Sequence, residues 1–279
     1  LRRMFAQTLW YQRDYDGAAA ELRKVIEKDP CEVEAFEFMG RIAEIRPETA
    51  GDPAKWFNDA VSKNPDSALA CAVRAAYWLR HDDKDQAVAD LTHALTCDLS
   101  DVSVRLRVIA ELTNAGEWDK AKEQLDALRA ASPDEIGLWT AWANLAIKRM
   151  DKEAMRKVAE EGMKAMNAGA WDFMPIAARL LILSSDLVKK DDGSYTLSDQ
   201  AKIDNYLSQL RNKEIDLPMV AYLQGLAAER QGRLSEAVTH WQRAISAPGV
   251  DEQTLLSAHR GLASAFSRLG DYRSAIGQL

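Results

Sequence analysis

Residues 219–248 contain two stretches in which apolar side chains recur every three or four positions. This spacing places the apolar side chains on one face of an α-helix, so we expect two helices, separated at Gly232. Gly225 and Ala237 have little or no side chain, which lets the two backbones approach closely, and Trp241 is expected to fill the wedge beside that contact. A helix pair of this kind cannot bury its apolar faces alone and needs a neighbour on each side.

Similar helix pairs recur along the chain. Pro30, Pro65, Leu99 and Pro133 each follow a stretch rich in Ala, Leu and Val, at separations of about 34 residues. This period predicts helix–turn–helix units that contact mainly their neighbours in the sequence. We predict a single array over residues 1–279, with approximate units 1–32, 33–67, 68–101, 102–135, 136–169, 170–217, 218–252 and 253–279.

The packing positions of these units follow the pattern of a known repeat family. In the second unit, Phe36 and Gly40 open the pattern, and Phe57, Ala60 and Pro65 close it. Corresponding residues stand in phase elsewhere, among them Trp139, Trp142, Ala143 and Ala146. The chain therefore resembles the tetratricopeptide repeat family over nearly its whole length. The resemblance implies an all-α fold, a right-handed α-solenoid (superhelix) of helix hairpins.

The sixth unit is longer than the others because residues 188–198 interrupt it. This segment has a run of charges and an Asp-Gly pair, which favour a turn, so we expect a loop that protrudes from one edge of the stack. After it, residues 199–211 are expected to form the second helix of the unit, with Ile203, Leu207 and Leu210 facing inward.

The two ends of the chain suggest that it is a fragment of a longer protein. The sequence begins without Met, and Leu279 falls inside the expected second helix of the last, truncated unit. An uncovered terminal unit would expose an apolar face, where natural arrays carry a polar cap. Self-association through such terminal repeats is a further expectation left open.

Composition excludes some classes of partner. The net charge of −7 and the lack of a basic stripe argue against nucleic acid, whose phosphates require clustered Lys and Arg. No apolar run approaches the length of a membrane helix. No signal peptide is visible, but a removed one would leave no trace, so a cytoplasmic location is favoured and a periplasmic one stays open.

No group of residues with catalytic or metal-binding spacing is found. No two of the four histidines stand three or four residues apart, and phosphate-loop and nucleophile motifs are absent. We therefore predict no enzyme activity, no cofactor and no metal site. Of the three cysteines, Cys71 is expected to be buried and Cys31 to lie in a loop. Carboxylates such as Asp90 are expected on solvated outer faces, and Trp118 is expected in the core.

The resemblance places function on the inner surface, which the first helix of each unit lines in this family. The middle of this surface is predicted to be apolar, which would suit a peptide or a partner protein. An alternative stays open, in which the winding of the array or another part of the protein covers it. The candidate partner-binding residues are Trp10, Arg41, Leu69, Leu79, Leu106, Asn114, Asn144, Lys148, Trp171, Met174, Leu181, Tyr222 and Leu226.

Some members of the family hold the acidic end of a chaperone with a matched set of Lys, Asn and Arg. Only Asn114, Asn144 and Lys148 are candidates for such a set here, so we do not expect that role. The sequence favours a non-catalytic scaffold that binds a peptide segment or partner protein in its concave groove. The alternative is a regulatory or assembly arm of a larger enzyme, or of a bacterial envelope machine for secretion or polysaccharide export.

Overall fold

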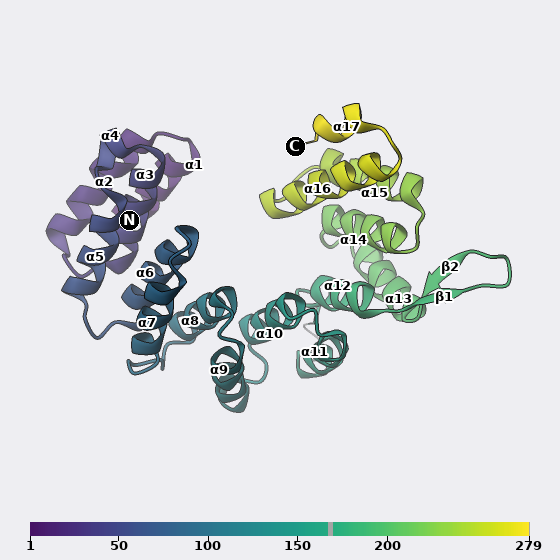
Figure 1. Cartoon of the computed structure of the whole chain (residues 1–279), viewed down its shortest axis with the longest axis horizontal. Coiled ribbons are helices and arrows are strands. Elements are labelled where there is room, and N and C mark those ends of the chain that lie inside the picture. Colours follow the sequence, from purple (N-terminus) through teal and green to yellow (C-terminus); the bar gives the residue numbers. More distant parts are fainter. Residues whose placement is uncertain (167–169, 279) are drawn as a thin grey trace. The chain divides into compact units, whose positions relative to one another are not determined.

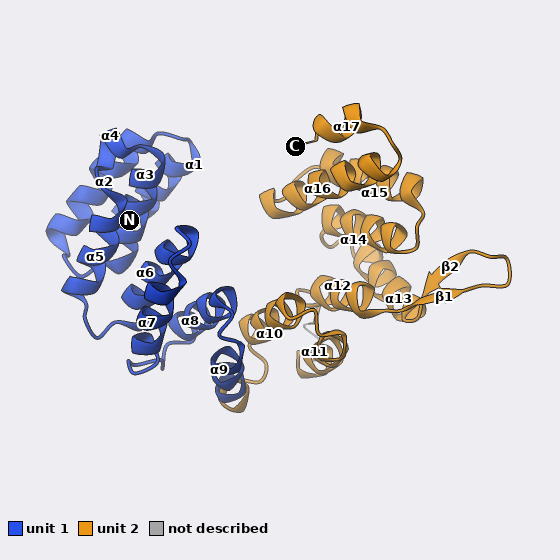
Figure 2. Ribbon diagram, viewed as in Figure 1, with its two compact units in different colours: residues 1–128 blue, residues 129–279 orange. Residues whose placement is uncertain are grey.

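A computed structural model describes residues 1–166 and 170–278. Leu279, expected inside the last helix, and the predicted junction at residue 169 lie outside the described residues. The chain divides into two compact units, Leu1–Leu128 and Arg129–Leu279, each built from antiparallel helix pairs (Figure 2).

The first unit is entirely α-helical in the described residues. Its neighbouring helices pair in sequence order, so that α1 packs on α2, α3 on α5 and α6 on α7 (Figure 1). The helices are α1 Arg2–Tyr11, α2 Tyr15–Lys28, α3 Val33–Ile45, α4 Pro47–Ala50, α5 Pro53–Lys63, α6 Ala68–Arg80, α7 Lys84–Ala94, α8 Val102–Ala115 and α9 Trp118–Ala131, the last of which runs into the second unit.

The second unit continues the pattern and adds one small sheet. Its elements are α10 Ile136–Lys148, α11 Lys152–Ala165, α12 Met174–Ser184, β1 Leu187–Lys189, β2 Tyr195–Leu197, α13 Gln200–Asn212, α14 Leu217–Arg230, α15 Leu234–Ser246, α16 Glu252–Arg268 and α17 Tyr272–Ile276. The expected inward residues of the helix after the insertion, Ile203, Leu207 and Leu210, are all buried in α13.

The turns before α2, α5, α7, α11 and α17 share one local design. In each of these turns, the residue that precedes the N-cap of the second helix has a left-handed conformation. Examples are Asp82 before α7, with φ 58°, and Met150 before α11, with φ 52°. An aspartate then caps the helix: the carboxylate of Asp83 accepts from the main-chain N–H of Gln86, and Asp151 accepts from Ala154. A left-handed residue reverses the chain and the carboxylate satisfies a free N–H, so a few residues determine where each of these helices begins.

Glycines let the hairpins nest closely. A Cβ added to Gly225 on α14 would lie 2.5 Å from Cδ1 of Trp241 on α15, and one added to Gly261 on α16 would lie 2.7 Å from Cζ2 of the same indole. Trp241 is 1% exposed, and its Nε1 donates to the carbonyl oxygen of Tyr222 at 3.1 Å. Trp241 lies directly beside Gly225, as expected for the residue that fills the wedge there. Gly40 faces Phe57 in the same way in the first unit.

The insertion between α12 and α13 is a two-stranded antiparallel hairpin rather than an irregular loop. Val188 pairs with Thr196, and Gly193, with φ 84°, supplies the left-handed residue of the turn. Val188, Tyr195 and Thr196, which are β-branched or aromatic, flank the Asp-Gly turn, and this composition favours pairing as strands. All three residues of β1 are exposed, and the hairpin extends away from the neighbouring helices in Figure 1.

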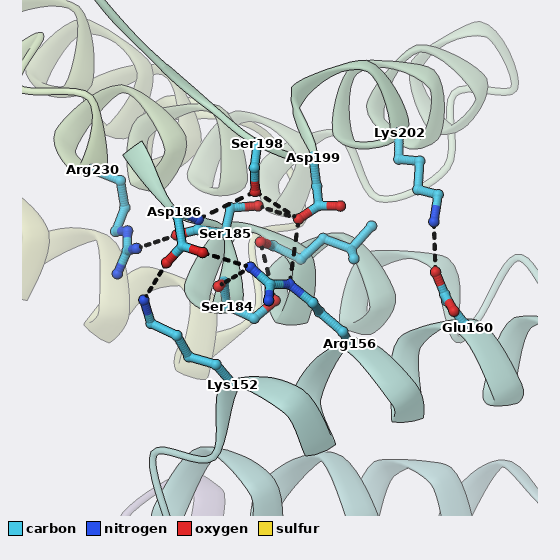
Figure 3. Close-up of polar contacts among 11 residues, drawn as sticks. Lys152, Arg156, Glu160, Ser184, Ser185, Asp186, Ser198, Asp199, Lys202 and Arg230 are labelled. Carbon is cyan, nitrogen blue, oxygen red and sulfur yellow. Dashed lines mark hydrogen bonds and ion pairs between the residues drawn. The ribbon is translucent and has the colours of Figure 1, made fainter. Parts of the chain in front are cut away.

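A polar network fixes the base of this hairpin on the helices (Figure 3). The carboxylate of Asp186 forms ion pairs with Nζ of Lys152 at 2.7 Å and with Nη2 of Arg156 at 3.2 Å. Asp199 accepts from the hydroxyls of Ser185 and Ser198 at 2.9 and 3.1 Å. A hairpin of this size has little stability of its own, so these contacts to α11 hold it in place.

Two expectations about burial are wrong. Trp118 is 40% exposed at the start of α9, outside the packed face that Ala121, Leu125 and Leu128 form. Asp90 is only 6% exposed rather than solvated. Nε and Nη2 of Arg74 donate to its two carboxylate oxygens at 2.8 and 2.6 Å, and this two-point pairing offsets the cost of burying the charge.

Candidate functional site

A groove in the second unit is lined by the first helices of four successive hairpins. Its volume is about 240 Å³. Asn144 on α10, Arg179 on α12 and Tyr222 on α14 contribute to its walls, and the first turn of α16 closes one end. The lining residues are Thr140, Ala143, Asn144, Ile147, Ile176, Arg179, Met219, Tyr222, Asp251, Gln253, Thr254 and Ser257.

Two polar groups of this groove are buried without a hydrogen-bond partner among the described residues. They are Nε of Arg179 and the hydroxyl of Thr254. Thr254 as a whole is 1% exposed. Buried polar groups in proteins are nearly always paired, so two unpaired groups on one groove mark a place where a ligand can supply partners.

Among the described residues, Asp251 is the only carboxylate that lines this groove. It caps α16, where its Oδ1 accepts from the main-chain N–H of Thr254 at 2.8 Å. The nearby Thr254 hydroxyl and this main-chain N–H lower the pKa of Asp251, although the hydroxyl does not reach good hydrogen-bond geometry. Asp251 therefore keeps its negative charge, and its Oδ1 already accepts a hydrogen bond from the protein itself.

The first unit has a groove of about 530 Å³ with a different character. Charged side chains dominate it, and they pair with one another. Arg107 on α8 forms two ion pairs. Its Nη2 lies 2.9 Å from Oε1 of Glu37 on α3, and its Nε lies 3.0 Å from Oε1 of Glu111. Burial works against the charge of Arg107, but the two carboxylates outweigh this effect and raise its pKa. The residues that line the groove are Glu37, Arg41, Ala76, Leu79, Arg80, Arg107, Glu111 and Asn114.

The structure brings five of the predicted site residues into these two grooves. Arg41, Leu79 and Asn114 line the groove of the first unit, and Asn144 and Tyr222 line the groove of the second. Each of them lies on the first helix of a hairpin.

The other candidates lie outside the grooves. Trp10 packs edge-on against Tyr15 and Phe38 under the Arg41 guanidinium, and Lys213 lies over the ring of Trp171. Met174 and Leu181 are core residues, 4% and 2% exposed. Leu69, Leu106 and Leu226 are partly buried, and Lys148 is exposed at the end of α10.

The groove of the first unit is mixed in character, unlike the apolar surface predicted for the middle of the inner face. Ala76 and Leu79 line it, and Arg80, Arg107 and Glu111 add charged surface beside them. In the second unit, Ile176 and Arg179 replace the expected Met174 and Leu181. A signal for Arg179 was present in the sequence, since it is the only charged residue in the apolar helix α12.

Two searches of the described residues bear on other kinds of site. No three His, Cys, Asp or Glu side chains gather where they could hold a metal ion. None of the helices in this part of the chain has both the length and the apolar character needed to span a membrane.

Stacked helix hairpins with an inner surface formed by each first helix define an α-helical repeat protein, or α-solenoid. The tetratricopeptide repeat model matches residues 3–68 and 222–279. These matches and the solved structures below support a tetratricopeptide repeat protein, as the resemblance predicted. None of the curated proteins compared with the chain matches it.

Solved structures share this fold at low sequence identity. A tetratricopeptide repeat protein from Parabacteroides merdae is 12% identical with a TM-score of 0.55, over 92% of this chain and 97% of that one. Yeast Tom70 is 14% identical with a TM-score of 0.58, over 91% of this chain and 50% of Tom70. Human IFIT1, solved as a dimer with PPP-AAAA, is 16% identical with a TM-score of 0.54, over 95% and 67%. At these identities the similarity shows the fold alone.

Proposed function

We propose that this chain is a non-catalytic scaffold for protein–protein interaction, and that it holds a peptide segment of its partner in the groove of the second unit. The tetratricopeptide fold supports the general role. The observation that carries the specific site is the pair of unpartnered polar groups, on Arg179 and Thr254, in a groove formed by four hairpins.

The chemistry of the groove suits an extended peptide. Such a peptide offers main-chain N–H and C=O groups at regular intervals, and side chains that alternate in direction. Asn144 and Thr254 can bond to the main chain, while Ile147, Ile176 and Met219 offer apolar contact. The groove of the first unit is less suited, because Arg107 already forms ion pairs with Glu37 and Glu111 there, and only the geometry of its Nε falls short of a hydrogen bond.

A display library of random peptides, selected on the whole chain, tests this proposal. Binders are then measured by fluorescence anisotropy against Asn144→Arg, which fills the groove from an exposed position on α10. Gln242→Arg is the matched control, an exposed amide on α15 that lies outside the groove. We expect Asn144→Arg to abolish binding and Gln242→Arg to leave it unchanged. Binding that survives Asn144→Arg, or failure to select any binder, would refute the proposed site.

A further inference from the structure

Arg179 differs from the other partly buried arginines of the second unit. Arg129 pairs with Glu161 at 3.1 Å, Arg156 pairs with Asp186, and Arg230 donates to the carbonyl oxygen of Ser185 at 2.8 Å. Arg179 has neither a hydrogen bond nor an ion pair with any of the described residues, and its Nε is fully buried. An arginine stays charged at every physiological pH, so this guanidinium holds an unmatched positive charge in the groove.

The remaining walls of the groove do not neutralise this charge. Thr140 and Asn144 on α10 and Ser257 on α16 are neutral. The Thr140 hydroxyl is already used, since it donates to the carbonyl oxygen of Ile136 at 2.9 Å. Asp251 keeps its negative charge where it caps α16, but it forms no ion pair with Arg179. Among the described residues, the groove therefore offers an unpaired guanidinium to whatever enters it.

A carboxylate fits this guanidinium better than a neutral group does. Guanidinium and carboxylate are planar, and their geometries match for two parallel hydrogen bonds. The Thr254 hydroxyl is buried beside Asp251, whose pKa it lowers, so the guanidinium of Arg179 supplies the main attraction for the carboxylate. A phosphate backbone is less suitable, since a single arginine in a chain of net charge −7 gives it little counter-charge.

We propose that Arg179 is the anchor for an acidic side chain, Asp or Glu, of the peptide that the groove holds. This inference rests on the proposed function and specifies its ligand. The residues involved, Arg179 and Thr254, are not among the Asn114, Asn144 and Lys148 that the sequence offered for a carboxylate-binding set. The acidic residue lies within the peptide, since the groove is walled by side chains of four helices along which a chain can continue.

The peptides selected for the groove test this proposal. We expect Asp or Glu to be enriched at one position, and replacement of that Glu by Gln to weaken binding about tenfold or more. Arg179→Gln should weaken binding of the acidic peptide by a similar factor and bind the Gln peptide as wild type does. Arg211→Gln, at an exposed position on α13, is the matched control and should have no effect.

The outcomes separate the two proposals. Selected peptides that Asn144→Arg blocks, but that bind Arg179→Gln as tightly as wild type, would overturn the anchor and leave the groove's function standing. Amidation of the peptide's C-terminus distinguishes a terminal carboxylate: if amidation abolishes binding and Glu→Gln does not, the acidic side chain is the wrong ligand. If no peptide depends on the groove, the proposed function itself fails. Circular dichroism of each variant verifies that the fold is retained.

Discussion

Substitution of Gly225 by Ala tests whether close packing at glycine determines how these hairpins stack. In a helix interior, alanine is favoured over glycine by about 0.5–1 kcal/mol, so propensity alone predicts a more stable protein. The new methyl would lie 2.5 Å from Cδ1 and 2.8 Å from Cε2 of Trp241. Those contacts are too short, so the indole or α15 must move.

The indole has little freedom to move. Trp241 is 1% exposed, lies close to Gly261 on its other side and donates to the Tyr222 carbonyl. Overpacking of a core costs about 1–3 kcal/mol, and loss of the hydrogen bond would add about 1 kcal/mol. These costs exceed the gain in propensity, so Gly225→Ala should destabilise the second unit by roughly 1–3 kcal/mol.

Urea unfolding followed by circular dichroism, with hydrogen exchange of α14 and α15, measures the effect where it arises. In a Trp241→Leu background the methyl has room, and Gly225→Ala should then be neutral or stabilising by up to about 1 kcal/mol. The reversal of sign is the decisive result. If Gly225→Ala leaves wild-type stability unchanged or increases it, the indole does not restrict this position and the packing argument is wrong.

Three further predictions concern charge and reactivity. Arg74→Met leaves the buried Asp90 carboxylate without its partner and should cost about 3–5 kcal/mol in urea unfolding, whereas the double variant Arg74→Met with Asp90→Leu should recover most of the loss. Hydrogen bonds from Lys152 and Arg156 lower the pKa of Asp186 in the folded protein. Its contribution to stability is therefore present above the unfolded pKa of about 3.9 and is lost as the pH falls through the folded pKa. Amide exchange in the hairpin should rise below about pH 4, and Asp186→Asn should remove this pH dependence. Burial raises the pKa of Cys71 to about 11, so a thiol reagent at mild alkaline pH should modify exposed Cys31 at once and Cys71 only on unfolding.

The sequence predicted which helices line the grooves but not all of the side chains that do so. It identified the first helix of each hairpin as the element that lines the grooves, and Asn144 and Tyr222 lie there. It did not find Arg179, because α12 is apolar on nearly all sides and its hydrophobic period does not select one inward face. The packing of α12 between its neighbours turns Met174 and Leu181 into the core and leaves Arg179 at the groove.

Local chemistry in the sequence determined the repeating hairpin. Aspartate caps and left-handed residues specify where second helices such as α7 and α11 begin. Small residues opposite aromatic ones specify where two helices touch, as Gly225 and Trp241 show. Both depend on residues a few positions apart or on adjacent helices, so they can be recognised along a single chain.

Tertiary structure alone decided which polar groups find partners. Arg107 reaches Glu37 across an intervening hairpin, and Arg74 lies where it neutralises Asp90, whereas Arg179 forms no ion pair with a described carboxylate. The rotation of each helix about its axis and the reach of long side chains determine these pairings. Spacing along the sequence contains neither quantity, so the groove's free charge became visible only in the folded chain.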